Sequence, residues 1–415
     1  MFGIAIMGYG TVGSGVADAV RFNADIIQRR TGVKPEVLRI LDVLEAPDSP
    51  DAAKITHQVE ELVNDDRIRT VIETMGGINA AYEFTKKMLN AKKHVVSSNK
   101  DVVAEYGPEL LALARENGVR YLFEASVGSG TPMIRPLERC LIANNIEEIH
   151  GILNGTTNFM LTYMTDCHTD WAQTLIEAQN RGYAEKDPAS DVEGHDSARK
   201  LAILSSIAYG HFVDWKQIRT KGITRIDAED VLYAAQMGYT VKLISRSSYR
   251  NGTLRASVEP VLLERENMLS KVSGVYNAVI IKGDIVEDVM FYGEGAGKKS
   301  TASAIVADLI DIATGGKTGE TYCWDRDAAL AVSDFTESCS RFYARILTDD
   351  RENCIQQILK ELPEAVLLPK NEQNPDRSVA FTTDELAETT FHEKMDRVAR
   401  IIPGTELQAV LKIGL

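Results

Sequence analysis

The segment 182–200, GYAEKDPASDVEGHDSARK, contains the densest group of side chains that could do chemistry. Asp196 and Lys200 are four residues apart near the start of a predicted helix, so they share one helix face. The helix continues with apolar residues at 201–204, which predicts that it is buried. Burying a lysine–aspartate pair costs desolvation energy. The pair is therefore either a structural ion pair or a lysine whose proton is used, oriented by acids that also bind an amino group.

A glycine-rich turn near the start of the chain has the spacing found in dinucleotide-binding folds. Gly8, Gly10 and Gly13 lie between an apolar run at 3–7 and an amphipathic helical pattern. The first glycine permits the turn, the second lets the backbone approach a pyrophosphate, and the third allows close helix–strand packing. The N-terminus of the helix would then face the phosphates. The strand–turn–helix context favours dinucleotide binding over a mere tight turn.

Two charged residues follow predicted strands, at the edge of the sheet where such folds bind ligands. Asp42 ends the second strand, where a carboxylate would accept hydrogen bonds from ribose hydroxyls and repel a 2′-phosphate. It could equally be an ordinary strand-end or capping residue. Lys100 follows the strand at 94–97 and could reach a cofactor or substrate. The alternative is a solvated lysine in a loop.

Other candidate groups give weaker signals. The glycine-rich segment 124–132 either makes a sharp turn or exposes carbonyl oxygens to a hard cation, and spacing alone favours the turn. A lone His195 is more typical of a structural role, and no ligand spacing predicts a transition-metal site. The five cysteines are scattered and odd in number, as expected for free thiols in a reducing compartment.

The elements that must position these residues follow from the hydrophobic pattern. Short apolar runs alternate with helical segments such as 80–90 and 108–117, which predicts a parallel, doubly wound α/β sheet. The predicted strands of this sheet are 3–7, 37–43, 70–74, 94–97 and 120–124.

From about residue 140 the pattern predicts an α+β unit. Its predicted strands are 146–153, 237–245, 254–262 and 278–292, and its predicted helices are about 159–180, 195–209, 228–235 and 300–314. The last 75 or so residues predict a βαββαβ order, which is a ferredoxin-like unit. Its predicted elements are strands 340–348, 365–368, 378–383 and 408–413 and helices 353–362 and 392–402.

Length, composition and charge limit the functions that the chain can have. A chain of 415 residues has room for two or three domains, and 44% hydrophobic with 26% charged residues is ordinary for a folded protein. A net charge of −14 argues against nucleic acid or an anionic membrane as the main partner. No apolar run approaches the roughly 18 residues of a membrane span. The start MFGIAIMGYG is typical of a first strand rather than a signal peptide, so we expect a cytoplasmic protein.

Taken together, the motifs resemble those of homoserine dehydrogenases over essentially the first 330 residues. The NGTTN segment and the long acidic loop ending in ARK are the most specific. The matching motifs are GYGTVGSGV (8–16), SSNKDVVA (97–104), FEASVGSGTP (123–132), GILNGTTNFM (151–160), GYAEKDPASDVEGHDSARK (182–200) and GEGAGKKSTASAIVADL (293–309). The C-terminal βαββαβ unit looks like the ACT regulatory domain that bacterial members often carry.

The resemblance implies an NAD(P)H-dependent, reversible reduction of L-aspartate 4-semialdehyde to L-homoserine, in the branch that leads to threonine and methionine. It implies that Lys200 is the general acid/base and that Lys100 is a second active-site lysine. Residues implied to bind substrate are Glu185, Asp191, Asp196, Thr156 and Thr157, of which Glu185 and Asp196 would hold the ammonium and hydroxyl ends. Residues implied to bind NAD or NADP are Gly8, Gly10, Thr11, Val12, Gly13, Asp42, Ser98, Lys100, Gly295 and Gly297. A monovalent cation, Na⁺ or K⁺, would be held mostly through the carbonyls of Glu124, Val127, Ser129 and Thr131, in place of the simple turn.

The chain departs from the family pattern at two points. Many members have a basic residue after the second strand, whereas this chain has Leu41-Asp42, which weakens the case for NADP. Amino-acid-binding ACT domains usually have a glycine in the turn after their first strand, and the turn 349–353 has none.

We therefore expect a Rossmann domain at 1–135, to which the chain returns at about 300–330, a catalytic and dimerisation domain at 136–330, and an ACT-like domain at 337–415. The expected partners are a small amino-acid substrate and further copies of the chain, as a homodimer or homotetramer. Two alternatives remain at this stage: a related dehydrogenase of another amino-acid aldehyde, and a non-catalytic amino-acid sensor derived from this fold.

Overall fold

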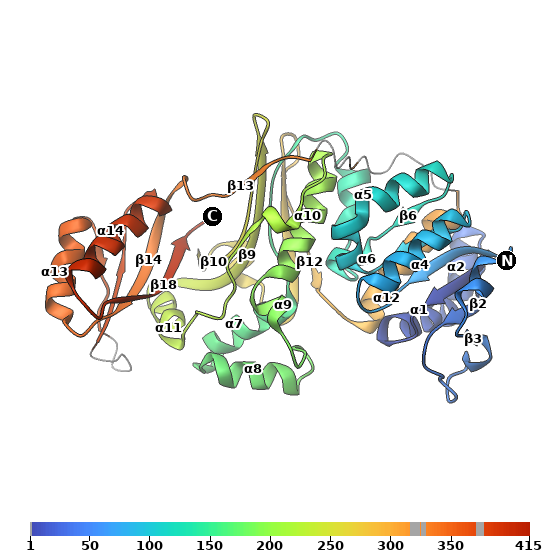
Figure 1. Cartoon of the computed structure of the whole chain (residues 1–415), viewed down its shortest axis with the longest axis horizontal. Coiled ribbons are helices and arrows are strands. Elements are labelled where there is room, and N and C mark those ends of the chain that lie inside the picture. Colours follow the sequence, from blue (N-terminus) through green and yellow to red (C-terminus); the bar gives the residue numbers. More distant parts are fainter. Residues whose placement is uncertain (1, 316–323, 325–328, 371–376) are drawn as a thin grey trace.

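The computed structural model describes residues 2–315, 324, 329–370 and 377–415. The described chain forms two sheets lying side by side along the long axis of the molecule (Figure 1). None of the helices in these residues is both long and apolar enough to cross a membrane.

The first sheet has six parallel strands in the order β3-β2-β1-β4-β5-β6, so the predicted doubly wound sheet is confirmed. The order reverses between β1 and β4, which creates the crevice where such sheets bind dinucleotides. The strands β1, β4 and β5 are buried almost throughout, as expected for strands covered on both faces, although β4 and β5 also carry polar residues. The six strands are β1 (Phe2–Met7), β2 (Pro35–Leu41), β3 (Ile55–Thr56), β4 (Ile68–Glu73), β5 (His94–Ser97) and β6 (Tyr121–Leu122).

Helices cover both faces of the first sheet. On one face α1 packs against α12, a helix from much later in the chain, around Ile6 and Leu309. Residues 316–323 and 325–328 of the expected return lie outside the described residues. The helices of this unit are α1 (Thr11–Phe22), α2 (Ala24–Thr31), α3 (Val59–Val63), α4 (Asn79–Asn90), α5 (Lys100–Glu116), α6 (Ala125–Gly128) and α12 (Lys298–Ala313).

The second sheet is mixed and begins with the order β12-β11-β7-β9-β10. The helices α7, α10 and α11 contact β9 and cover one face. The strands are β7 (Ile146–Ile152), β9 (Tyr239–Arg250), β10 (Thr253–Glu264), β11 (Tyr276–Gly283) and β12 (Glu287–Glu294), and two short strands, β8 (Arg219–Thr220) and β13 (Val332–Ser333), pair with β10. The helices are α7 (Gly155–Cys167), α8 (Trp171–Asn180), α9 (Ala189–Val192), α10 (His195–Tyr209) and α11 (Ala228–Gln236).

Two predicted elements of this unit are wrong in their extent. The single helix expected at about 159–180 is two helices, because His168 has a left-handed φ of 53° that ends α7. The first of them begins earlier than expected, because the side chain of Asn154 caps it by accepting a hydrogen bond from the backbone N–H of Thr157. The single strand expected at 278–292 is a hairpin of β11 and β12.

The C-terminal unit has the predicted βαββαβ order and the sheet order β18-β14-β16-β15, which is ferredoxin-like. Its two helices cover one face around Phe342, Phe381 and Phe391. A short strand, β17, was not expected, and the second helix begins earlier than predicted. The elements are β14 (Cys339–Leu347), α13 (Arg351–Glu361), β15 (Val366–Leu367), β16 (Ser378–Thr382), β17 (Leu386–Ala387), α14 (Glu388–Ile401) and β18 (Glu406–Ile413).

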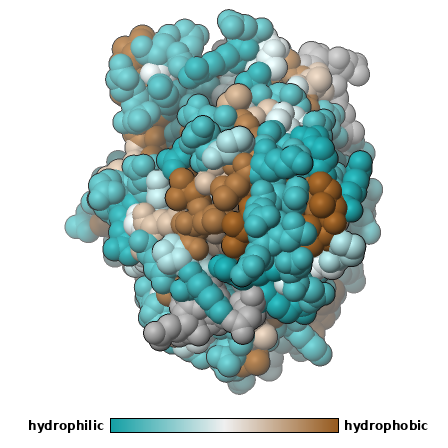
Figure 2. Space-filling view, turned by 90° about the vertical axis from the view of Figure 1, so that its left-hand side faces the viewer, coloured by the Kyte–Doolittle hydropathy of each residue, from teal (hydrophilic) through white to brown (hydrophobic). Residues whose placement is uncertain are grey.

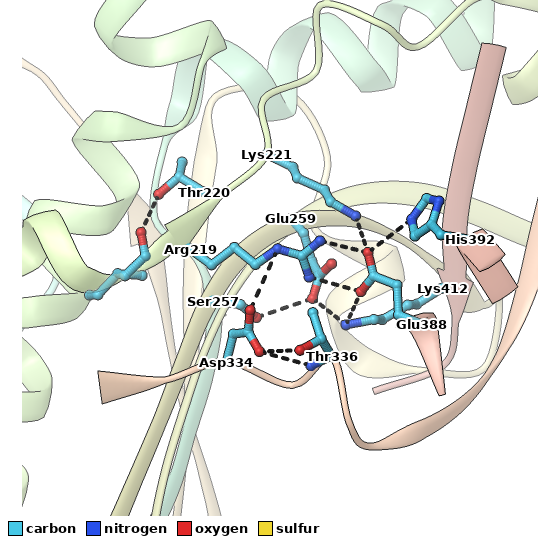
Figure 3. A network of polar contacts seen from close by, with 11 residues as sticks. Arg219, Thr220, Lys221, Ser257, Glu259, Asp334, Thr336, Glu388, His392 and Lys412 are labelled. Atoms are coloured by element: carbon cyan, nitrogen blue, oxygen red, sulfur yellow. Dashed lines mark hydrogen bonds and ion pairs between the residues drawn. The ribbon is translucent and has the colours of Figure 1, made fainter. Parts of the chain in front are cut away.

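A buried carboxylate joins this unit to the second sheet (Figure 3). Glu388, at the start of α14 and 1% exposed, forms a two-point ion pair with Arg219 at 2.6 and 2.8 Å. Lys221 approaches the same carboxylate at 2.5 Å, and Lys412 of β18 bridges it to Glu259 of β10. Two backbone pairs between β10 and β18 continue the sheet across the junction. The C-terminal unit is thus held by charge as well as by strand pairing.

Candidate active site

Two lysines from different units meet on one buried aspartate. The Nζ of Lys200 lies 2.8 Å from Oδ2 of Asp196, and the Nζ of Lys100 lies 2.8 Å from Oδ1 of the same residue. Lys200 also donates a hydrogen bond of 2.9 Å to the backbone carbonyl of Leu153. An ammonium has three N–H groups. The described residues therefore occupy two of those on Lys200 and leave one for a ligand.

Helix starts position Lys100 and Asp196, and Lys200 lies one turn after Asp196. Lys100 is the first residue of α5, which follows β5 and is capped by the side chain of Asn99. Asp196 lies in the first turn of α10, after Gly194, whose left-handed φ of 83° turns the chain into the helix. The expected i,i+4 pair of Asp196 and Lys200 is present on one face of the helix. Both residues are buried, with Asp196 2% and Lys200 7% exposed.

Burial and the neighbouring charges shift the pKa of the Asp196 carboxyl in opposite directions. Burial by itself would raise its pKa, but the two ammonium groups of Lys200 and Lys100 outweigh burial and hold the pKa well below its usual range. The negative charge of Asp196 in turn raises the pKa of Lys100. Asp196 is thus a fixed anion around which the two lysines are arranged.

Asn154 lies at the centre of the cluster, and the sequence analysis did not single it out. Its Nδ2 donates to Oδ1 of Asp191 at 2.7 Å and to Oδ2 of Asp196 at 2.9 Å. Its Oδ1 accepts from the N–H and hydroxyl of Thr157. One signal was present in the sequence, because an asparagine before a helix is a typical cap, but nothing local predicts that its amide also bridges two acids.

The predicted substrate residues divide into those inside the cluster and one outside it. Thr156 donates to Oδ2 of Asp191 at 3.1 Å, and Thr157 is buried against Asn154. Burial, followed by the charge of Asp196, raises the pKa of Asp191. Glu185 differs, because its side chain is exposed and makes no ion pair or hydrogen bond with the cluster within the described ranges.

The glycine turn has the shape that dinucleotide binding needs. Gly8 has a φ of 92°, and a Cβ at Gly13 would come within 1.9 Å of the Gly8 carbonyl, so neither position tolerates a side chain. A Cβ at Gly10 would meet nothing within 4 Å, which leaves this point open to a ligand. The helix α1 begins directly afterwards at Thr11-Val12, so its N-terminal N–H groups lie at the turn.

Asp42 lies against this turn. Its Oδ2 accepts a hydrogen bond of 2.5 Å from the N–H of Tyr9, and its Oδ1 accepts one from Leu44. A carboxylate at the end of β2 beside the glycine turn can face the ribose of a dinucleotide. The capping interpretation also holds in part, since both oxygens accept backbone N–H groups.

Ser98 and a buried glutamate lie where β4 and β5 end. The N–H of Ser98 donates to the carbonyl of Glu73, which is fully buried. The Glu73 carboxyl accepts from the Ser97 hydroxyl and the Met75 N–H, and burial raises its pKa to about 7. Glu73 was not predicted as a site residue, although a glutamate at the end of a buried strand is unusual.

Two glycines precede α12. A Cβ at Gly295 would lie 2.4 Å from the side-chain amide of Asn277, and Gly297 has a φ of 143°. Both positions therefore require glycine. They lie in the loop that leads back from the second sheet to the first, between the two units that carry the lysines.

The predicted cation loop is folded tightly. The carboxylate of Glu124 accepts three hydrogen bonds, from the N–H groups of residues 133–135. Val127 lies in α6, and Ser129 has a left-handed φ of 54° with its hydroxyl on Ser300 and Thr301. Thr131 packs against Gly293. In the described part of the chain, no cluster of three or more His, Cys, Asp or Glu could hold a metal ion.

A glycine turn at the switch point of a doubly wound sheet, with paired lysines nearby, defines an oxidoreductase that depends on a nicotinamide dinucleotide. Two family models match the chain, "Homoserine dehydrogenase, NAD binding domain" at residues 8–124 and "Homoserine dehydrogenase" at residues 132–310. The homoserine dehydrogenase of Bacillus subtilis (strain 168) is 40% identical over 321 residues, which cover 77% of this chain and 74% of that protein. The chain belongs to the homoserine dehydrogenase family.

Solved structures agree with this assignment. The crystal structure of a homoserine dehydrogenase from Thiobacillus denitrificans has a TM-score of 0.88 at 30% identity, and the match covers 100% of this chain and 98% of that one. A hyperthermophilic archaeal homoserine dehydrogenase in complex with NADPH has a TM-score of 0.65 at 28% identity, covering 77% of this chain and 99% of that one. The chain is thus an NAD(P)-dependent oxidoreductase acting on a CH–OH group. It interconverts aspartate 4-semialdehyde and homoserine in aspartate-family amino-acid biosynthesis.

Proposed function

We propose that Lys200 transfers the proton in this reaction and that Asp196 and Leu153 hold it in place. Reduction of an aldehyde develops negative charge on its oxygen, and a positioned ammonium both stabilises that charge and donates a proton. One observation supports the assignment. Lys200 is only 7% exposed, contacts the fixed acceptors Asp196 and Leu153, and has one N–H left for the substrate. When bound, the dinucleotide supplies the hydride chemistry.

Lys100 acts as the second cation of the site. Its side chain is 35% exposed and touches Asp196 from the first sheet, so it can reach a ligand that lies between the two units. In the oxidation direction Lys200 acts as the neutral amine and accepts the hydroxyl proton to become the ammonium, and Lys100 keeps Asp196 ionised throughout. The separate origins of the two lysines make the reaction depend on how the two units are placed.

The acids of the cluster bind the amino acid. Asp191 and Asp196 share the amide of Asn154, and Thr156 orients Asp191, so carboxylates face the space where a substrate ammonium would lie. Glu185 is the third acid assigned to the ammonium, from the exposed loop before α9. The charge of the ammonium favours such a partner, and the loop would have to bring the Glu185 side chain to the substrate.

The cofactor site uses the turn Gly8–Gly13, with Ser98, Gly295 and Gly297 at its edges. We assign a preference for NAD because Asp42 presents a carboxylate beside the turn, where a 2′-phosphate would be repelled. A monovalent cation at Glu124, Val127, Ser129 and Thr131 would hold the segment 124–131 together, mostly through backbone oxygens.

We also propose that the enzyme is a cytoplasmic homodimer or homotetramer. The four described cysteines are free thiols, which suits a reducing compartment. Figure 2 shows an apolar patch on the end of the molecule that the C-terminal unit forms. Leu359, Val366 and Ile401 of this unit are exposed. The strand β15 pairs only with β16 in the described chain, so its other edge can pair with a second copy.

A direct test is the initial rate of homoserine oxidation with NAD and with NADP, beside a panel of other amino-acid alcohols. A rate for homoserine at least about tenfold above the others supports the assigned substrate, since the polar cluster selects by charge and hydrogen bonding. A higher rate with another alcohol would favour the related dehydrogenase. The absence of turnover with every alcohol would favour the sensor.

A further inference from the structure

The carbonyl of Leu153 has two donors, and the second one is Asn277. Lys200 donates to this oxygen at 2.9 Å and Nδ2 of Asn277 donates to it at 3.0 Å. A carbonyl oxygen has two lone pairs, so these contacts use its full accepting capacity. The amide of Asn277 must point its Nδ2 towards Leu153, because the reverse orientation would place Oδ1 of Asn277 against the Leu153 carbonyl oxygen.

The strand ladder explains why Asn277 reaches this carbonyl. The strand β11 pairs with β7 through Ala278 and Ile152, the last backbone pair before the chain leaves the sheet at Leu153. One residue further, the Asn277 side chain replaces the backbone as partner. It therefore holds the peptide Leu153–Asn154, whose two residues contact Lys200 and Asp196 respectively.

The surroundings of Asn277 leave it little freedom. The residue is fully buried, and the backbone of Gly295 packs directly on its amide. Its Oδ1 is buried and has no donor within the described ranges. An unpaired buried oxygen is costly, so a purely structural role would be better served by an apolar residue. The cost is understandable if the Nδ2 contact is needed and Oδ1 faces a site that a ligand fills.

We propose that Asn277 is a positioning residue for proton transfer: by fixing the Leu153 carbonyl, it aims the third N–H of Lys200 at the substrate oxygen. This inference rests on the role proposed for Lys200. It extends that role to a residue that lies on another strand and touches none of the charged groups.

A matched control lies nearby. Asn158 of α7 is also a buried asparagine, whose Nδ2 donates to the carbonyls of Val272 and Tyr276 and whose Oδ1 accepts from Lys242. It thus makes the same kind of contacts with carbonyls and a lysine, outside the candidate active site. Replacing either asparagine by alanine should lower the melting temperature, but only Asn277 should affect chemistry.

The first experiment compares Asn277→Ala with Asn158→Ala in the full-length enzyme. We expect Asn277→Ala to lower kcat by about tenfold or more, with the KM of the dinucleotide within about twofold of wild type, because a small misplacement of a catalytic group is costly. Asn158→Ala should keep kcat within about twofold at a similar loss of melting temperature. Equal kcat values for the two variants would overturn the proposal.

The second experiment uses Asn277→Asp, which keeps the shape. As a carboxylate it cannot donate to Leu153, whereas its protonated form can, so its kcat relative to wild type in aldehyde reduction should rise as the pH falls. The same ratio for Asn277→Ala should stay flat. A flat ratio for Asn277→Asp contradicts the proposal, and this variant decides the matter if Asn277→Ala does not fold. Lys200→Met distinguishes a failure of the role proposed for Lys200 from a failure of the role proposed for Asn277. If Lys200→Met keeps wild-type turnover, both roles are wrong. If Lys200→Met is inactive while both Asn277 variants are normal, only the positioning role is wrong.

Discussion

The Nζ of Lys100 lies 2.8 Å from Oδ1 of Asp196, and this ion pair joins the helix that follows β5 of the dinucleotide-binding sheet to the helix that carries Lys200. Because α5 and α10 come from different units, the geometry of proton transfer depends on their packing against each other.

Replacing Lys200 should nearly abolish turnover. Lys200→Met removes the proposed proton donor, and such groups contribute about 10²–10⁴-fold to the rate. The matched control is Lys242→Met, since Lys242 is also buried but bonds only Asn158 and Val272 in the described chain. Steady-state kcat should fall for the first variant alone. A kcat above about a tenth of wild type in Lys200→Met would refute the assignment.

Removing the negative charge of an acid assigned to the substrate ammonium should weaken homoserine binding. Asp191→Asn and Glu185→Gln keep the shape of each side chain, and loss of a charged hydrogen bond is worth about 1.5–3 kcal/mol. We expect a raised KM for homoserine in both variants. The structure makes Asp191 the stronger test because Asn154 and Thr156 fix it, whereas Glu185 is exposed. An unchanged KM in Glu185→Gln would remove that residue from the site.

Asp42 should set the preference between dinucleotides. Asp42→Ala removes the carboxylate that would repel a 2′-phosphate and should shift kcat/KM from NAD towards NADP. The variant also loses the bond to the Tyr9 N–H, so some loss with both cofactors is expected. The ratio of kcat/KM for the two cofactors is the measurement. A wild-type enzyme that already prefers NADP would contradict the assignment without any variant.

Glu73 should make stability depend on pH. Burial raises its pKa to about 7 from 4.5, so the folded state binds more protons than the unfolded state between these values. The free energy of unfolding should therefore fall by about 3 kcal/mol as the pH rises through this window. Glu73→Gln cannot ionise, so its unfolding free energy relative to wild type should be higher at pH 8 than at pH 5. Urea unfolding at both pH values measures the difference, and an equal offset at both would rule out a raised pKa.

Glu388 should anchor the C-terminal unit. Glu388→Gln leaves Arg219 and Lys221 without their shared carboxylate, and breaking a buried pair costs about 3–5 kcal/mol. Because these cations lower the pKa of Glu388, its contribution is present above the unfolded pKa and is lost as the pH falls. Glu393→Gln on the same helix is the control, since Glu393 is exposed. Similar thermal unfolding curves for the two variants near pH 7 would contradict the anchoring role.

Local patterns determined much of this protein. The alternation of short apolar runs with helical segments predicted the doubly wound sheet, because buried strands and the helices that cover them leave different periods in the sequence. The glycine turn was predicted as well, and Gly13 is required there because a side chain would strike the Gly8 carbonyl. The four-residue spacing of Asp196 and Lys200 predicted their shared face and burial, since helix geometry alone places them together. The C-terminal βαββαβ order followed from the same patterns.

Tertiary packing decided the contacts between segments far apart in the chain. The meeting of Lys100 with Asp196, the bridge that Asn154 makes between two acids, and the hold of Asn277 on the Leu153 carbonyl each join different elements. Spacing within one helix or strand determines which side chains share a face. It carries no information on which face of another element that side chain meets, because that depends on how the two units pack around their common core.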